Sequence, residues 1–242
     1  VEFGANWSVV TDKPLDTLVK NLQRSHELAV ESMDGTKTAA DRQSMAYEID
    51  SILEQVLLIA NTPYGSNYLF GGTSGQAPFT ETRDANGRIL TVGTGGVDSS
   101  QQRTIRASEN FTANYGATAT GPEGAFQNTT ENVDVFATLL DLRNSLLAGN
   151  PPVSSATTGL EGIERSMDVA VNSLVKNGAN QNYLQALSSH YDNLELEHTR
   201  QISAYDEVDM AKEITELSKL EVSLTAAMQM ASRLNQMDLT KY

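Results

Sequence analysis

The stretch from Met210 to Asn235, MAKEITELSKLEVSLTAAMQMASRLN, decides the fold of this chain. Leucine and alanine recur in it at alternating intervals of three and four residues, which is the spacing of one face of a helix. A single helix cannot bury such an apolar stripe against itself, so the pattern predicts packing against partner helices. The residues that we expect at this assembly interface are Ile214, Leu217, Leu220, Leu224, Ala227, Ala231 and Leu234.

The same periodicity extends back to about Thr157, and the chain has no proline after Pro152. It therefore predicts one long C-terminal helix, whose stripe is interrupted near Asn177 and Gly178 by polar or small groups that favour close packing. Apolar residues of this helix and of two N-terminal segments should form the core of the helical part. That core is expected to contain Leu18, Leu22, Ile49, Ile52, Val56, Leu160, Ile163, Met167, Leu174 and Leu184.

The first third of the chain predicts two antiparallel helices. After a non-helical lead-in over residues 1–10, a helix capped by Thr11 or Asp12 should run to a stop at Gly35, with Pro14 in its first turn. Thr38 can cap a second helix, which should end at residues 61–63 because a residue before proline leaves helical geometry.

Helical periodicity disappears between residues 64 and 130, where glycine, threonine and asparagine are frequent. Asn86-Gly87 predicts a hairpin turn, and residues 103–108 and 111–115 predict further strands. A helix resumes at about Asn132. The fold class is thus mainly α with an inserted β domain (α+β), and the expected division is a helical domain (1–72 and 131–205), a β-rich insert (73–130) and a C-terminal assembly helix (206–242).

The composition argues against several classes of function. A net charge of -14 disfavours nucleic acid or an anionic membrane as partner. The absence of cysteine excludes disulfides and thiolate metal sites, and no apolar run is long enough to span a membrane. His190 and His198 would lie about 12 Å apart on one helix, too far to share a metal ion alone. No nucleophile motif occurs, so we expect no catalytic, metal or cofactor site and no enzymatic activity.

Four segments resemble one known family. The stretches 27–62, ELAVESMDGTKTAADRQSMAYEIDSILEQVLLIANT, and 202–236, ISAYDEVDMAKEITELSKLEVSLTAAMQMASRLNQ, are similar to conserved blocks of bacterial flagellins and their relatives. The turn YLFGG at 68–72 is similar to the version in the hook-filament junction proteins of this flagellin-like family, and the stretch 177–187, NGANQNYLQAL, also matches.

The resemblance implies an elongated helical rod that carries a small β domain. It also implies a structural role in the bacterial flagellum, in which a ring of copies joins hook to filament through rod packing and terminal coiled coils. The implied partners are other copies of the chain, another hook-associated protein, flagellin, and an export chaperone on the C-terminal helix. The chain would be exported through the type III flagellar apparatus without a cleaved signal peptide and would lie outside the cell.

Family members carry an additional N-terminal helix, which we expect this chain to lack, leaving it monomeric or weakly self-associating. Three alternatives stay open at this point. The chain could be a filament flagellin, a secreted coiled-coil module whose β insert binds a host or sugar ligand, or an enzyme, for which the sequence offers no convergent polar site.

Overall fold

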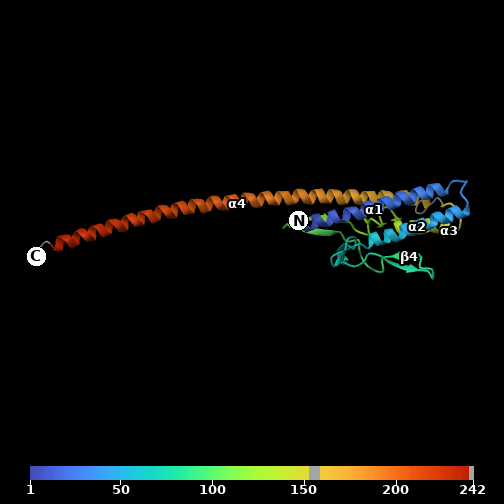
Figure 1. Ribbon diagram of the computed structural model, residues 1–242, viewed down its shortest axis with the longest axis horizontal. Helices are drawn as coiled ribbons and strands as arrows, with labels where there is room; N and C mark the ends of the chain where they lie inside the picture. The colour runs from blue at the N-terminus through green and yellow to red at the C-terminus, as the bar shows by residue number, and fades with distance from the viewer. Residues whose placement is uncertain (153–158, 240–242) are drawn as a thin grey trace. The chain divides into compact units, whose positions relative to one another are not determined.

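The computed structural model describes residues 1–152 and 159–239, with the side chains of these residues except 206–209 and 235–239. Residue contacts divide the chain into two compact units, Val1–Ser188 and Ser189–Tyr242. The first unit contains α1 (Glu2–Ser32), α2 (Ala39–Ala60), α3 (Val135–Leu147) and the first part of α4 (Gly159–Leu239), as labelled in Figure 1. The expected fold class, mainly helical with inserted β structure, is confirmed.

The hairpin of α1 and α2 is built on the predicted capping residues. The Thr38 hydroxyl accepts a hydrogen bond from the Asp41 amide at 3.2 Å, and the Asp41 carboxylate accepts one from the Thr38 amide at 2.8 Å. This reciprocal pair satisfies two amides that a helix start would otherwise leave open. The α2 helix ends at Ala60, three residues before the extended Pro63–Tyr64 segment begins, so its predicted bounds are confirmed.

The lead-in predicted over residues 1–10 is wrong, because α1 begins at Glu2 and Pro14 lies in its interior. An interior proline disfavours a helix by about 3 kcal/mol. Burial offsets this cost, since Trp7 is 1% exposed and Leu15 is fully buried. The Thr11 hydroxyl donates to the Trp7 carbonyl at 2.8 Å inside the helix and does not cap a helix start.

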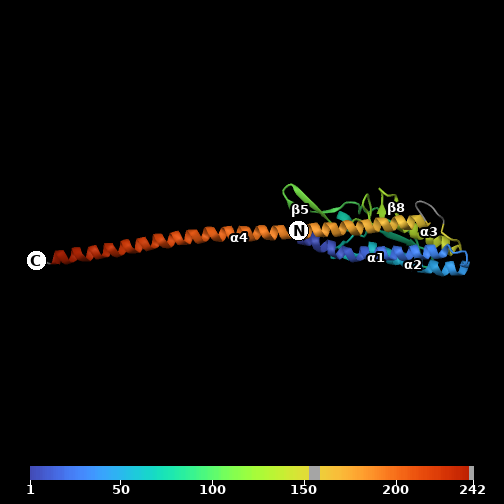
Figure 2. The same cartoon turned by 90° about the horizontal axis from the view of Figure 1, so that it is seen from above.

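Helix α1 and the first part of α4 lie side by side in both views (Figures 1 and 2) and are antiparallel. Asn177 Nδ2 donates to the Ser8 carbonyl at 2.8 Å near the start of α1, whereas His26 Nε2 lies 3.2 Å from Glu164 Oε1 near its end. Residue numbers therefore rise along α1 while those of the contacting residues on α4 fall, as expected for two antiparallel helices. His26 lies at the edge of this packed pair, and the buried Asn177 agrees with the packing role expected for it.

The β structure consists of four separate two-stranded antiparallel sheets. The turn at Asn86-Gly87 joins one predicted pair, and the strands expected at 103–108 and 111–115 form another. A short 3-10 helix, η1 (Gly72–Ser74), precedes them. The pairs are β1 (Pro63–Tyr64) with β2 (Asn67–Tyr68), β3 (Thr80–Arg83) with β4 (Ile89–Gly93), β5 (Arg103–Ser108) with β6 (Phe111–Tyr115), and β7 (Gln127–Asn128) with β8 (Val133–Asp134).

An aromatic cluster joins these segments to one another and to α3. The ring centroids of Phe79 and Phe136 lie 4.8 Å apart, and those of Phe70 and Phe126 lie 5.2 Å apart. All four rings are buried. Phe136 belongs to α3, and both Phe79 and Phe126 contact it, so the segments before β3 and β7 pack on that helix.

A buried arginine fixes the β3–β4 hairpin to the helices. Arg143 on α3 is 3% exposed, and its Nη1 donates to the Ile89 carbonyl at 2.6 Å and to Asp50 Oδ1 on α2 at 2.9 Å. Arg83 Nη2 also donates to Glu54 Oε2 on α2 at 2.9 Å. These contacts lie within the first unit, and the finer division at 72/73, 130/131 and 205/206 stays a prediction.

Candidate assembly surface

The seven residues expected at the assembly interface all lie on the part of α4 that belongs to the second unit, and all are exposed. Ile214, Leu217, Leu220, Leu224 and Leu234 are between 58% and 68% exposed. At about 100° per residue, they and the two alanines occupy an arc of about 160° on the helix. Met210 and Met228 lie within the same arc and are also exposed, so the stripe carries more apolar surface than the seven residues alone.

An apolar stripe of this width contributes nothing to stability while it faces water. Burying apolar area gains about 25 cal/mol per Å², and a coiled-coil partner would cover this arc along its length. Contiguous exposed apolar surface of this kind marks protein interaction sites. The stripe can therefore hold another helix, and it has no chemical groups for catalysis.

The expected core residues lie in the first unit. Leu18, Leu22, Ile49, Val56, Ile163 and Leu184 are fully buried, and Ile52 is 4% exposed. Leu160, Met167 and Leu174 are partly buried and pack against the same core. Apolar stripes that look alike in sequence therefore differ in the structure. Those of the first unit are buried, whereas the stripe of the second unit is exposed.

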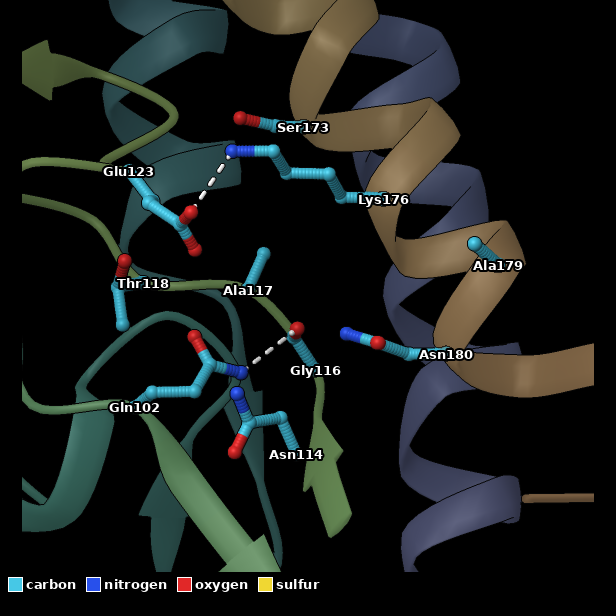
Figure 3. Close-up of a pocket in the computed structure, with 10 residues that line it drawn as sticks. All are labelled: Gln102, Asn114, Gly116, Ala117, Thr118, Glu123, Ser173, Lys176, Ala179 and Asn180. Carbon is cyan, nitrogen blue, oxygen red and sulfur yellow. Dashed lines mark hydrogen bonds and ion pairs between the residues drawn. The ribbon is translucent and has the colours of Figure 1, made fainter. Parts of the chain in front are cut away.

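A polar pocket of about 240 Å³ lies between α4 and the segment that follows β6 (Figure 3). Figure 3 shows Lys176 extending from α4 toward Glu123, with their charged atoms 2.9 Å apart. Gln102 Nε2 donates to the Gly116 carbonyl at 3.1 Å. The two charged lining residues thus neutralise each other, and the Gln102 amide holds the loop.

Two features near this pocket were not foreseen from the sequence. The Arg103 guanidinium lies 4.3 Å from the centroid of the Trp7 ring, and the Ser8 hydroxyl accepts a hydrogen bond from the Gly116 amide at 3.1 Å. Gly116 has a φ of 70°, and a Cβ there would lie 2.8 Å from the Trp7 ring. These contacts join α1 to the β5–β6 hairpin through pairs far apart in sequence, which local patterns do not reveal.

The described residues contain neither a candidate metal site nor a candidate membrane-spanning helix. No group of three or more histidine or acidic residues there could hold a metal ion. None of the helices, over the residues that the structure describes, has an apolar stretch of the length needed to cross a membrane.

Comparison with known proteins gives a consistent set of relatives, although no family model matches the chain. It is 22% identical over 241 residues to flagellar hook-associated protein 3 of Escherichia coli strain K12, covering 93% of this chain and 74% of that protein. A crystal structure of flagellar hook associated protein-3 from Legionella pneumophila matches with a TM-score of 0.66 and 13% identity, covering 86% of this chain and 94% of that chain.

The flagellar junction protein FlgL from Legionella pneumophila matches with a TM-score of 0.59 and 14% identity, covering 76% of this chain and 93% of that chain. The chain has the fold of hook-associated protein 3. The names of these relatives describe flagellar components and not enzymes, in agreement with the expectation from sequence.

The YLFGG turn at 68–72 connects β2 to η1, shortly after the end of α2. Leu69 and Phe70 are fully buried there. Gly72 has a φ of 54°, and a Cβ on it would lie 2.7 Å from the Gln101 carbonyl oxygen. Only glycine fits this close approach in a left-handed conformation, which gives a physical reason for the motif that carried the resemblance.

Proposed function

We propose that the chain is a structural protein of the bacterial flagellum that joins the hook to the filament. The observation that carries this function is the exposed apolar stripe of the C-terminal unit, in a chain with the fold of hook-associated protein 3. A protein that works by assembly needs a surface that is unfavourable in water and favourable against a partner. The stripe from Ile214 to Leu234 meets this requirement.

The proposed partners follow from the same surface. Copies of the chain associate in a ring, and the ring contacts flagellin on one side and another hook-associated protein on the other. Before assembly, an export chaperone covers the stripe and prevents aggregation. The chain then leaves the cell through the flagellar export apparatus without a cleaved signal peptide and is part of an extracellular appendage.

Of the two main alternatives, a ligand-binding module is weaker on structural grounds. A ligand-binding β insert would need exposed aromatic side chains gathered on it, but Phe79, Phe126 and Tyr115 are buried and only Phe111 of this set is exposed. A filament flagellin shares the exposed stripe, and only assembly behaviour distinguishes it from a junction protein.

The test replaces the gene for this chain in the bacterium that encodes it and examines the cells by electron microscopy. Deletion should leave bare hooks, the unaltered gene should restore filaments, and Leu220→Asp with Leu224→Asp should not. The matched control is Val222→Asp, which changes an exposed apolar residue, 69% exposed, on the opposite side of the helix. Filaments that persist after deletion would refute the junction role, and long filaments formed by the purified chain alone would identify a flagellin.

A further inference from the structure

The apolar stripe of the C-terminal unit contains acidic side chains, whereas the cations of the same stretch lie on the other side of α4. Residues 210–234 include three glutamates and three cations, and all six are exposed. At about 100° per residue, the glutamates lie within the arc of the stripe or at its border, and the cations lie outside it. The glutamates are Glu213, Glu216 and Glu221, and the cations are Lys212, Lys219 and Arg233.

The heptad repeat places these charges relative to a partner helix. With Leu217 at position a, Leu220 falls at position d, so the leucines form a coiled-coil seam. Glu213 is then also at position d, inside the seam. Glu216 is at position g and Glu221 at position e, and these two positions border the seam. Each of the three cations is at position c, which points away from a partner.

The helix cannot itself neutralise the two glutamates that lie inside the stripe. Side chains on one helix interact when they are three or four residues apart. Glu213 and Glu221 have no lysine or arginine at these spacings, whereas Glu216 has Lys212 and Lys219 within reach. When a partner covers the stripe, Glu213 loses contact with water, and a buried carboxylate without a cation is strongly unfavourable. A partner that covers the stripe must therefore bring positive charge to Glu213 and Glu221.

A second copy of the same helix does not bring this charge. In a parallel pair in register, position g of one helix lies beside position e of the next heptad of the other, so Glu216 would face Glu221 of the second copy. Glu213 would face its own equivalent in the seam. In an antiparallel pair, position e faces e and position g faces g. Between residues 210 and 234, positions a, d, e and g carry no cation, so both orientations bring carboxylates together without relief.

We propose that the stripe of α4 binds a helix of a different sequence, whose apolar seam carries and is bordered by lysine or arginine. This inference rests on the proposed function, because it names the chemistry of the partner that covers the stripe. A cation of the partner opposite Glu213 fixes the register of the pair, and cations opposite Glu216 and Glu221 fix its choice of partner. The acidic groups also keep copies of the chain from pairing through their stripes. Copies in the assembly are then bridged at this surface by the partner helix.

A charge-reversed variant of the chain provides a partner of this chemistry. It keeps the apolar seam and replaces the acidic groups by basic ones, through Glu213→Lys, Glu216→Lys and Glu221→Lys. A control variant changes the net charge by the same amount at exposed residues of α4 outside 210–234, through Asp192→Lys, Glu195→Lys and Glu197→Lys. Full chains are purified and mixed in pairs at low salt. One chain of each pair carries an N-terminal fluorophore, and sedimentation velocity measures the association.

The original chain and the charge-reversed variant should bind each other at least about tenfold more tightly than either binds itself. High salt should reduce this difference, because it screens exposed charges. The original chain should bind the control variant no more tightly than it binds itself. Self-association of the original chain as tight as its binding to the charge-reversed variant, equal binding of the control variant, or no association in any mixture would overturn the proposal.

The same variants distinguish this inference from the junction role in the bacterium that encodes the chain. In cells without the original gene, the control variant should restore filaments. The charge-reversed variant should leave bare hooks, because its basic groups repel those of the partner. Filaments restored by the charge-reversed variant would reject the proposed partner chemistry and leave the junction role intact. Filaments that form after deletion alone would reject the junction role, and the pairing preference measured in solution would still stand.

Discussion

Replacing Arg143 with methionine should destabilise the first unit by about 3 kcal/mol. Methionine retains most of the apolar volume, so the loss comes mainly from the hydrogen bonds to Ile89 and Asp50. The Ile89 carbonyl is buried and would have no donor, which costs about 1 to 3 kcal/mol. Asp50 has a side chain that is 23% exposed, so water partly replaces its bond to Arg143 and its loss costs about 1 kcal/mol.

Urea unfolding followed by tryptophan fluorescence measures this change, because Trp7 is the only tryptophan and is buried in the first unit. With an m-value of about 2 to 3 kcal/mol/M, the midpoint should fall by about 1 M urea. Arg106→Met is the matched control, since Arg106 is exposed and bonds carbonyls in its own hairpin; it should change stability by less than about 0.5 kcal/mol. Equal midpoints for the two variants would refute the anchoring role of Arg143.

Three further predictions concern local features of the first unit. Thr38→Ala removes one half of the capping box and should cost about 1 kcal/mol in urea unfolding. Hydrogen bonds from the amide and hydroxyl of Thr38 lower the pKa of Asp41 below 3.8, so the stability that the ionised Asp41 contributes is present above about pH 5 and is lost as the pH falls through the lowered pKa. The loss of stability in acid should therefore be shallower in Thr38→Ala, and an unchanged loss would contradict this. Gly116→Ala should destabilise the first unit by about 2 kcal/mol or more, because it combines a left-handed φ with a clash against Trp7. Gly178→Ala lies in a helix and its new Cβ meets no neighbour within 4 Å, so it should stabilise the first unit by about 0.5 to 1 kcal/mol.

Local chemistry made part of the fold predictable. The capping residues at Thr38, the turn at Asn86-Gly87 and the strands at 103–108 and 111–115 each depend on a few adjacent residues, and all were located correctly. The start of α1 was not, because the residues before Pro14 are helical through contacts with β6 and α4 that lie more than a hundred residues away.

The sequence periodicity located the apolar stripe on α4, but it did not tell whether the stripe is buried or exposed. The same periodicity describes the buried stripe around Ile163 and the exposed stripe around Leu220, and only the structure distinguishes them. Arg143 was visible as a charged residue in an otherwise apolar helical stripe, which is a signal for a buried ion pair. Its partners, Asp50 and Ile89, come from two other segments and could not be named from spacing.

The separation of the β structure into four independent hairpins has a consequence for variation and engineering. Each hairpin closes its own backbone hydrogen bonds between strands adjacent in sequence, so a longer loop at one tip does not disturb another sheet. A Cβ added to Gly87 at the tip of the β3–β4 hairpin would meet no atom within 4 Å. A peptide tag or an antigenic segment inserted there would leave the helical core intact, and related proteins could lengthen this hairpin without redesigning the rest of the chain.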